Sequence, residues 1–149
     1  MSSDSRTATV VVGYDGSAAA RRAVAYAVWL AGGGRIVLVH AREPAPPRAT
    51  SRWRELLDAD QDAGRRAMLD AAPQEAPELA AASWEARLAS GAPARAIAEV
   101  AREVGADAIV VGSRGFVSVA ERLGSVSAEL VRDADRPVTV IPPGAVGIG

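Results

Sequence analysis

The sequence contains no cysteine, no lysine and no asparagine, and its single histidine is His40. Without cysteine, disulfides, thiolate metal sites and cysteine nucleophiles are excluded. Without lysine, the chain lacks the residue that a Walker-type phosphate loop requires, and it lacks the amine for Schiff-base chemistry. One histidine rules out a multi-histidine metal site. We therefore expect His40 to be a hydrogen-bonded residue near a strand end.

The sequence also lacks an excess of charge of one sign and lacks a long apolar run. The 149 residues include 17 basic and 18 acidic side chains, for a formal net charge of −1. This balance gives no long-range attraction to nucleic acid or to an anionic membrane. No apolar run approaches the roughly 20 residues of a membrane span, and the serine-rich start lacks a signal-peptide pattern. We expect a cytoplasmic chain with one domain over 1–149, loose at 1–7 and 144–149.

Short apolar runs alternate with amphipathic segments along the whole chain. β-branched runs favour buried parallel strands, and strands separated by helices predict parallel pairing. We expect an α/β fold of the Rossmann-like type, with a five-stranded open sheet flanked by about four helices. The expected strands are Ala8–Val12, Ile36–His40, Ser83–Ala89, Ala108–Val111 and Val138–Ile141. The expected helices are Ser17–Ala31, Trp53–Ala72, one that begins at Gly91-Ala92-Pro93, and Ser125–Arg132.

The second expected helix follows an expected exposed loop, 42–51, which holds three prolines. Apolar and small residues recur along one side of this helix and predict its buried face: Trp53, Leu56, Leu57, Gly64, Ala67, Met68 and Ala71. Charged residues recur on the other side and predict a solvated face: Asp58, Asp60, Asp62, Arg65 and Arg66.

Glycines and hydroxyls converge in the stretch from Asp107 to Ser127. A buried strand is followed by Gly112-Ser113-Arg114-Gly115, and a helix is expected to begin at Gly124-Ser125-Val126-Ser127. A helix N-terminus offers unsatisfied N–H groups to an anion, and glycine lets the backbone approach closely. Arg114 adds a fork of donors. The spacing is compatible with phosphate binding and equally with an ordinary strand–turn–helix connection.

These motifs together resemble the universal stress protein family. The resemblance rests on Gly112-x-x-Gly115 followed by Gly124-Ser125, on the closing Pro137-Val-x-Val140 strand, and on three segments nearer the N-terminus. Those segments are Val10-Val11-Val12-Gly13-Tyr14-Asp15-Gly16-Ser17, Ile36-Val37-Leu38-Val39-His40-Ala41, and Ser90-Gly91-Ala92-Pro93 with Ile97. The resemblance covers roughly residues 8–142.

The resemblance implies the strand order 3-2-1-4-5. Ligands of open α/β sheets bind where the strand order reverses, which here is between the first and fourth strands. The resemblance then implies an adenine nucleotide there, ATP possibly with Mg²⁺, bound with slow hydrolysis or none. Asp15 is a candidate for the ribose hydroxyls, or only for the turn before the first helix. The expected contacts are Gly13, Tyr14, Asp15, Val39, Ala41, Gly112, Ser113, Arg114, Gly115, Gly124, Ser125, Val126 and Ser127. No catalytic residue and no metal ligand is expected.

An alternative function remains open, because the glycine loop is short. Members that bind nucleotide usually have nine residues between the second glycine and the Gly-Ser pair, whereas 116–123 is eight residues long. The alternative is a dimeric member without nucleotide, which acts through contacts with an unknown regulatory protein. The last strand is apolar and should lie at a sheet edge, so we expect a homodimer through Pro137 to Pro142.

Overall fold

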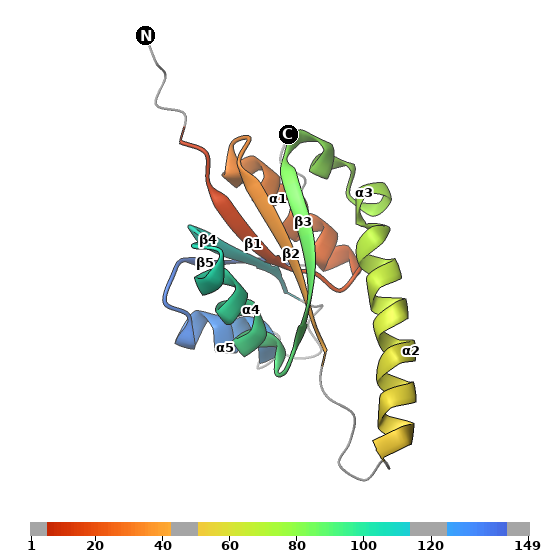
Figure 1. Cartoon of the computed structure of the whole chain (residues 1–149). Coiled ribbons are helices and arrows are strands. Elements are labelled where there is room, and N and C mark those ends of the chain that lie inside the picture. The colour runs from red at the N-terminus through yellow and green to blue at the C-terminus, as the bar shows by residue number, and fades with distance from the viewer. Residues whose placement is uncertain (1–5, 43–50, 114–124, 143–149) are drawn as a thin grey trace.

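The computed structural model is a five-stranded parallel sheet between two layers of helices (Figure 1), and it describes residues 6–42, 51–113 and 125–142. The strands are β1 (Thr9–Gly13), β2 (Arg35–Arg42), β3 (Ser83–Ser90), β4 (Ala108–Gly112) and β5 (Val138–Ile141). The helices are α1 (Ala18–Ala31), α2 (Ser51–Asp70), α3 (Ala72–Glu75), the 3₁₀ helix η1 (Pro77–Ala81), α4 (Pro93–Glu103) and α5 (Ser125–Asp133).

The strand order is β3-β2-β1-β4-β5, which confirms the order that the resemblance implied. All neighbouring strands pair in parallel, and β1 lies at the centre between β2 and β4. Val10, Val11 and Val12 of β1 are fully buried, as expected for a strand covered by helices on both faces. The order reverses between β1 and β4, so the two chain segments that leave these strands diverge at one edge.

Side chains that alternate along the central strands build two separate cores. One core joins Val10 and Val12 to α1, α3, η1 and the C-terminal end of α2. The other joins Val11 to α4 and α5. This division follows from the period of two along a strand, which sends successive side chains to opposite faces.

The helix ends follow the capping residues in the sequence. Ser17 accepts a hydrogen bond from the Ala20 backbone N–H at 3.1 Å and caps α1. Gly32 ends α1 in the left-handed conformation, with φ of 57°. Pro93 lies in the first turn of α4, where its missing N–H costs no hydrogen bond. α1 and α4 are thereby held at fixed positions relative to the carboxyl ends of β1 and β3.

The orientation of α2 corrects the expected faces of this helix. Its half-buried face carries Asp58 and Asp62, which pair with Arg42 at the end of β2 at 3.0 and 2.8 Å. Leu56 and Leu57 point away from the sheet instead, and they are 58% and 41% exposed. The prediction was wrong for these leucines and aspartates, because Arg42 lies beside this helix and pairs with its carboxylates, while Leu69 anchors its C-terminal end in the first core.

Two short helical turns, α3 and η1, occupy the segment where Pro73 and Pro77 predicted only a break. Each begins with a proline in its first turn, and their buried Ala72 and Leu79 close the end of the first core. The expected loop at 43–50 and the tails at 1–5 and 143–149 lie outside the described residues. Within the described segments, no helix is long and apolar enough to cross a bilayer.

Candidate functional site

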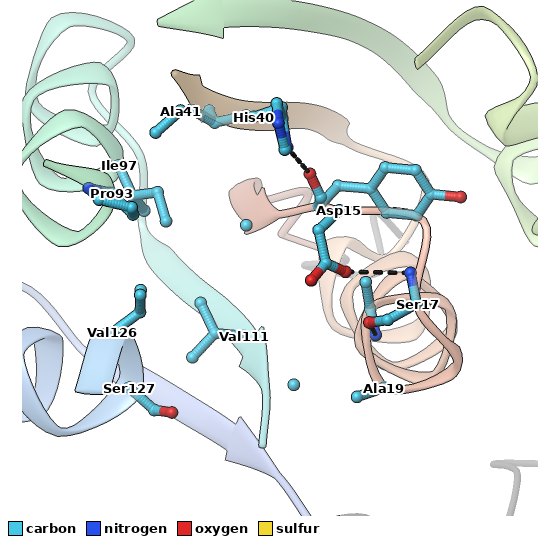
Figure 2. Close-up of a pocket in the computed structure, with 15 residues that line it drawn as sticks. Asp15, Ser17, Ala19, His40, Ala41, Pro93, Ile97, Val111, Val126 and Ser127 are labelled. Atoms are coloured by element: carbon cyan, nitrogen blue, oxygen red, sulfur yellow. Dashed lines mark hydrogen bonds between the residues drawn. The ribbon is translucent and has the colours of Figure 1, made fainter. Parts of the chain in front are cut away.

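A cavity of about 210 Å³ opens where β1, β2 and β4 end (Figure 2). It lies at the edge where the strand order reverses, which is the position expected for a ligand in an open α/β sheet. Its lining comes from six elements, β1, α1, β2, α4, β4 and α5, and from the turn after β1. The lining residues are Gly13, Tyr14, Asp15, Ser17, Ala19, Ala20, Val39, His40, Ala41, Pro93, Ile97, Val111, Gly112, Val126 and Ser127.

The floor of the cavity is the turn after β1, and hydrogen bonds fix its shape. The Tyr14 N–H donates to the Val39 carbonyl at 2.9 Å, and His40 Nδ1 lies 2.9 Å from the Tyr14 carbonyl oxygen. A carbonyl oxygen only accepts, so Nδ1 carries the proton and donates. His40 is therefore the hydrogen-bonded residue that the sequence predicted, and it holds the ends of β1 and β2 together.

Asp15 lies in the same turn, at the cavity and beside the start of α1 (Figure 2). Its Oδ1 accepts a hydrogen bond from the Ser17 N–H at 3.0 Å. Asp15 therefore stabilises the turn before α1, which is one of the two roles that the sequence allowed. A carboxylate has two oxygens and about four acceptor positions, so a turn hydrogen bond and a ligand contact are compatible at one aspartate.

One wall of the cavity is apolar and comes from elements far apart in the chain. Val39 and Ala41 end β2, Pro93 and Ile97 come from the first turns of α4, and Val111 comes from β4. Figure 2 shows Ile97, Val111 and Val126 gathered on one side, with Asp15 on the other. A flat apolar group of a ligand can lie against such a wall without displacing buried polar groups.

The opposite end of the cavity is formed by the end of β4 and the start of α5. Val126 and Ser127 lie in the first turn of α5, and both line the cavity. The first backbone N–H groups of a helix have no partner within the helix, and they carry the positive end of its dipole. This end of the cavity is therefore suited to a negatively charged group.

Gly112 brings β4 close to α1. A Cβ at this position would lie 2.5 Å from the Ala19 carbonyl oxygen, so only glycine fits. Ser113 follows, donates its backbone N–H to the Ile141 carbonyl at 2.8 Å, and is buried away from the cavity lining. The glycine at 112 thus serves the packing of β4 on α1, and its backbone also lines the cavity.

Most of the expected contact residues come together at this cavity. Eight of the thirteen line it: Gly13, Tyr14, Asp15, Val39, Ala41, Gly112, Val126 and Ser127. Ser113 does not, and Ser125 begins α5. The remaining three, Arg114, Gly115 and Gly124, lie outside the described residues.

Sequence reasoning missed the lining residues that belong to helices and to strand interiors. Ala19, Pro93, Ile97 and Val111 are part of the cavity but carry no motif for ligand binding. A signal was present for Pro93, because a helix that starts directly after β3 begins at the same sheet edge as the strand ends. The others depend on packing between α1, α4 and β4, which the sequence pattern does not specify.

Tyr14 contributes its backbone to the turn and its ring to the core. The residue is 2% exposed and belongs to the core around α1, and no described group gives its buried Oη a hydrogen bond. Burial raises the pKa of the Tyr14 phenol above its ordinary value of 10.0, and the negative charge of Glu75 adds to this increase. The phenol is thus a neutral buried group.

The described residues offer no metal centre. Among them, no three histidine, aspartate or glutamate side chains are grouped in a way that could hold an ion. Asp15 is the one carboxylate in the described lining of the cavity.

A family profile and individual relatives match the same family along nearly the whole chain. The profile of the universal stress protein family matches residues 7–142. The chain is similar to a Thermus aquaticus protein described as a universal stress protein in the QAH/OAS sulfhydrylase 3′ region. The two are 36% identical over 142 residues, covering 89% of this chain and 97% of the relative.

Solved structures agree with the sequence comparison. A universal stress protein in complex with cAMP is 33% identical, with a TM-score of 0.68 over 93% of this chain and 98% of that one. The universal stress protein from Archaeoglobus fulgidus in complex with dAMP is 26% identical, with a TM-score of 0.62 over 91% and 97%. On its sequence, its strand order and these relatives, the chain belongs to the universal stress protein family.

Proposed function

We propose that this chain is a stress-response regulatory protein that binds an adenine nucleotide, ATP in the first instance, in the cavity between β1 and β4. The observation that carries the proposal is the convergence of three surfaces on one cavity. These are an apolar wall, the carboxylate of Asp15 and the first turn of α5. Base, ribose and phosphate require these three kinds of surface in the same order.

The apolar wall suits the base. Val39, Ala41 and Ile97 present aliphatic surface to the cavity, and such surface favours a flat heterocycle over water. Two related proteins support an adenine in particular, because one was solved with cAMP and the other with dAMP. We propose the same class of ligand for the present chain.

Asp15 and α5 suit the rest of the nucleotide. Asp15 accepts the ribose hydroxyls, and the backbone N–H groups at Val126 and Ser127 approach the phosphates. Gly112, Gly115, Gly124 and Arg114 complete the phosphate contacts by family resemblance. Mg²⁺ enters with the phosphates of ATP and water as its ligands, since Asp15 is the one carboxylate in the described lining.

The same lining supports binding with slow turnover or none. Fast phosphoryl transfer uses a positioned base and several charges at the γ-phosphate. The described lining offers one carboxylate, and its Oδ1 already accepts the Ser17 N–H. We therefore expect phosphate release from ATP to be far slower than ATP dissociation, which a single-turnover assay with labelled ATP measures.

The test is a thermal-shift and calorimetric titration of the purified chain with adenosine, AMP, ATP and GTP, each with and without Mg²⁺. Adenine nucleotides should raise the melting temperature, and adenosine should bind more weakly than AMP because it lacks the phosphate. Mass spectrometry of the supernatant from boiled protein shows whether nucleotide co-purifies. No shift at millimolar ATP would favour the alternative, a member that works through protein contacts without nucleotide.

A variant of the apolar wall makes the test specific. Ala41→Phe fills the side of the cavity where the base would lie and should weaken ATP binding by at least about tenfold, or 1.4 kcal/mol. Ala80→Phe adds the same bulk at an exposed position of η1 and should leave affinity unchanged. Equal affinity of Ala41→Phe and wild type would place the nucleotide elsewhere.

We further propose that the chain forms a homodimer through Pro137 to Pro142. β5 is an edge strand, paired on one side with β4, and Val138, Thr139 and Val140 are only half-buried. An apolar sheet edge favours pairing with another strand, and a second copy supplies it by two-fold symmetry. Light scattering at micromolar protein tests this, and a monomeric mass would contradict it.

A further inference from the structure

The N-terminal half of α2 presents its large apolar side chains to solvent. Leu56 and Leu57 are 58% and 41% exposed, and Trp53 on the same side is 63% exposed. The positions 53, 56, 60, 63 and 67 follow spacings of three and four residues, which is the seam pattern of helices that pack along each other. All five are exposed. The seam is apolar at four of its five positions and is interrupted by Asp60. It nevertheless forms a row along the helix, unlike isolated leucines on a surface.

The inner face of α2 explains why this seam cannot rotate into the core. Asp58 and Asp62 pair with Arg42, and Arg65 lies 3.9 Å from Asp62. These groups are half-buried against the end of β2. Turning the seam inward would break the ion pairs and leave Arg42 facing leucine side chains. The outward orientation is therefore the one that the charges stabilise.

We propose that the outer face of α2, defined here as the seam with its flanking Leu57 and Gly64, binds the same face of a second copy in antiparallel orientation. Figure 1 shows α2 along the β3 side of the molecule, with its N-terminal part extending beyond the strands.

The sizes of the side chains are complementary in the antiparallel arrangement. The N-terminal half of the outer face carries the large Leu56 and Leu57, and the C-terminal half carries the small Ala63, Gly64 and Ala67. Antiparallel packing places the large half of each helix on the small half of the other. A Cβ on Gly64 would meet nothing within 4 Å in the single chain, so intrachain packing does not account for the glycine.

The charges beside the seam are complementary as well. Arg52 and Asp70 each lie nine positions from residue 61, and both flank the seam, since Arg52 precedes Leu56 by four positions and Asp70 follows Ala63 by seven. Both are exposed. Antiparallel pairing about this midpoint places Arg52 near the partner's Asp70. Parallel pairing would oppose like charges, so the charge pattern selects the antiparallel orientation.

Asp60 lies in the seam one position from the midpoint, so the two copies bring this acid close to its counterpart. That repulsion weakens the pairing and keeps it dependent on protein concentration. This contact differs from the edge of β5, because α2 lies beside β3 at the other end of the sheet. With both contacts in use, the chain would form a tetramer or a longer assembly instead of a dimer.

The test is sedimentation equilibrium of the full chain at concentrations from micromolar to several hundred micromolar. Arg52→Glu and Asp70→Arg should each weaken one association step by about tenfold. The double variant should return to within about threefold of wild type, because the charges are exchanged and not lost. Glu78→Arg, an exposed reversal on η1, should leave the association unchanged.

Two further variants separate the interface from folding. Leu56→Glu should lower the mass at high concentration by about a factor of two, with the circular dichroism spectrum unchanged. Asp60→Ala should tighten the association, which a merely damaged fold would not do. The proposal is overturned if wild type shows no step sensitive to Leu56→Glu. It is equally overturned if the charge double fails to restore association, since the two charges then do not face each other across an antiparallel helix pair.

Discussion

At the scale of the residue, Tyr14 belongs to the cavity through its backbone and to the core through its ring. Its backbone carbonyl holds His40 at the cavity, whereas its ring packs against α1 with a phenol that no described group satisfies. Burying an unsatisfied hydroxyl costs about 1–3 kcal/mol. Tyr14→Phe removes that hydroxyl without changing the backbone. It should hold or raise the free energy of unfolding by up to about 1 kcal/mol in urea titrations. Nucleotide affinity should not change.

The phenol also makes stability depend on alkaline pH. Burial raises the pKa of Tyr14 above 10.0 in the folded chain, so the folded state keeps the proton longer than the unfolded state. This contribution is complete below pH 10 and is lost as the pH rises through the raised pKa. In Tyr14→Phe, the fall in unfolding free energy between pH 9 and pH 11 should be smaller than in wild type. An identical fall would show that other groups cause it.

Gly112 and Gly64 offer the same substitution with opposite expected results. A Cβ at 112 would lie 2.5 Å from the backbone oxygen of Ala19, so Gly112→Ala should destabilise the fold by about 1–3 kcal/mol. At 64 a Cβ meets open space in a helix, and Gly64→Ala should stabilise it by about 0.5–1 kcal/mol. Urea denaturation at submicromolar protein compares the two, with no contribution from helix pairing. Destabilisation by both would contradict this account.

At the scale of the element, α2 is held by charges near its middle and by apolar contacts at its C-terminal end. Arg42 pairs with Asp58 and Asp62 near the middle of the helix, whereas Met68 and Leu69 join the core at its end. Among the described residues, the N-terminal half has little apolar burial of its own, and Arg42 of β2 forms ion pairs between the helix and the sheet.

This attachment predicts a local effect of removing the arginine. Arg42→Met leaves two half-buried carboxylates without their partner, which costs about 1–3 kcal/mol between the exposed and buried limits for ion pairs. Amides of 52–63 should exchange faster with deuterium, whereas β1 and β4 keep their protection. Arg95→Met, on the exposed side of α4, is the control. Uniformly faster exchange over the sheet would contradict a local role.

The same helix marks where prediction from sequence was weakest. All five strands start and end within two residues of the predicted limits, because β-branched runs and the alternation at 83–89 are both typical of strands. The faces of α2 were predicted wrongly at Leu56 and Asp58 but correctly at Met68, since periodicity identifies an apolar side but not what the helix packs against. Arg42 belongs to another element, and its position beside Asp58 exists only in the folded chain.

At the scale of the whole molecule, the site was predictable at the strand ends and unpredictable elsewhere. Asp15, Val39 and Gly112 follow from the rule that ligands bind where the strand order reverses. Ala19, Pro93 and Ile97 complete the cavity from helices whose rotation and tilt determine which side chains reach it. Those quantities depend on packing between layers, and of these residues only Pro93 had a signal in the sequence, because its helix starts directly after β3.

The cavity joins segments from the two halves of the sheet, and this makes a final prediction. Its lining takes Asp15 from the β1–α1 turn, Pro93 from α4 and Ser127 from α5. A ligand that spans it should slow deuterium exchange at all three places together, because binding to the folded state suppresses every opening that disrupts the cavity. The measurement is exchange mass spectrometry with and without saturating ATP, with α2 as the internal reference. Protection confined to one segment would mean that the ligand binds one wall and not the space between them.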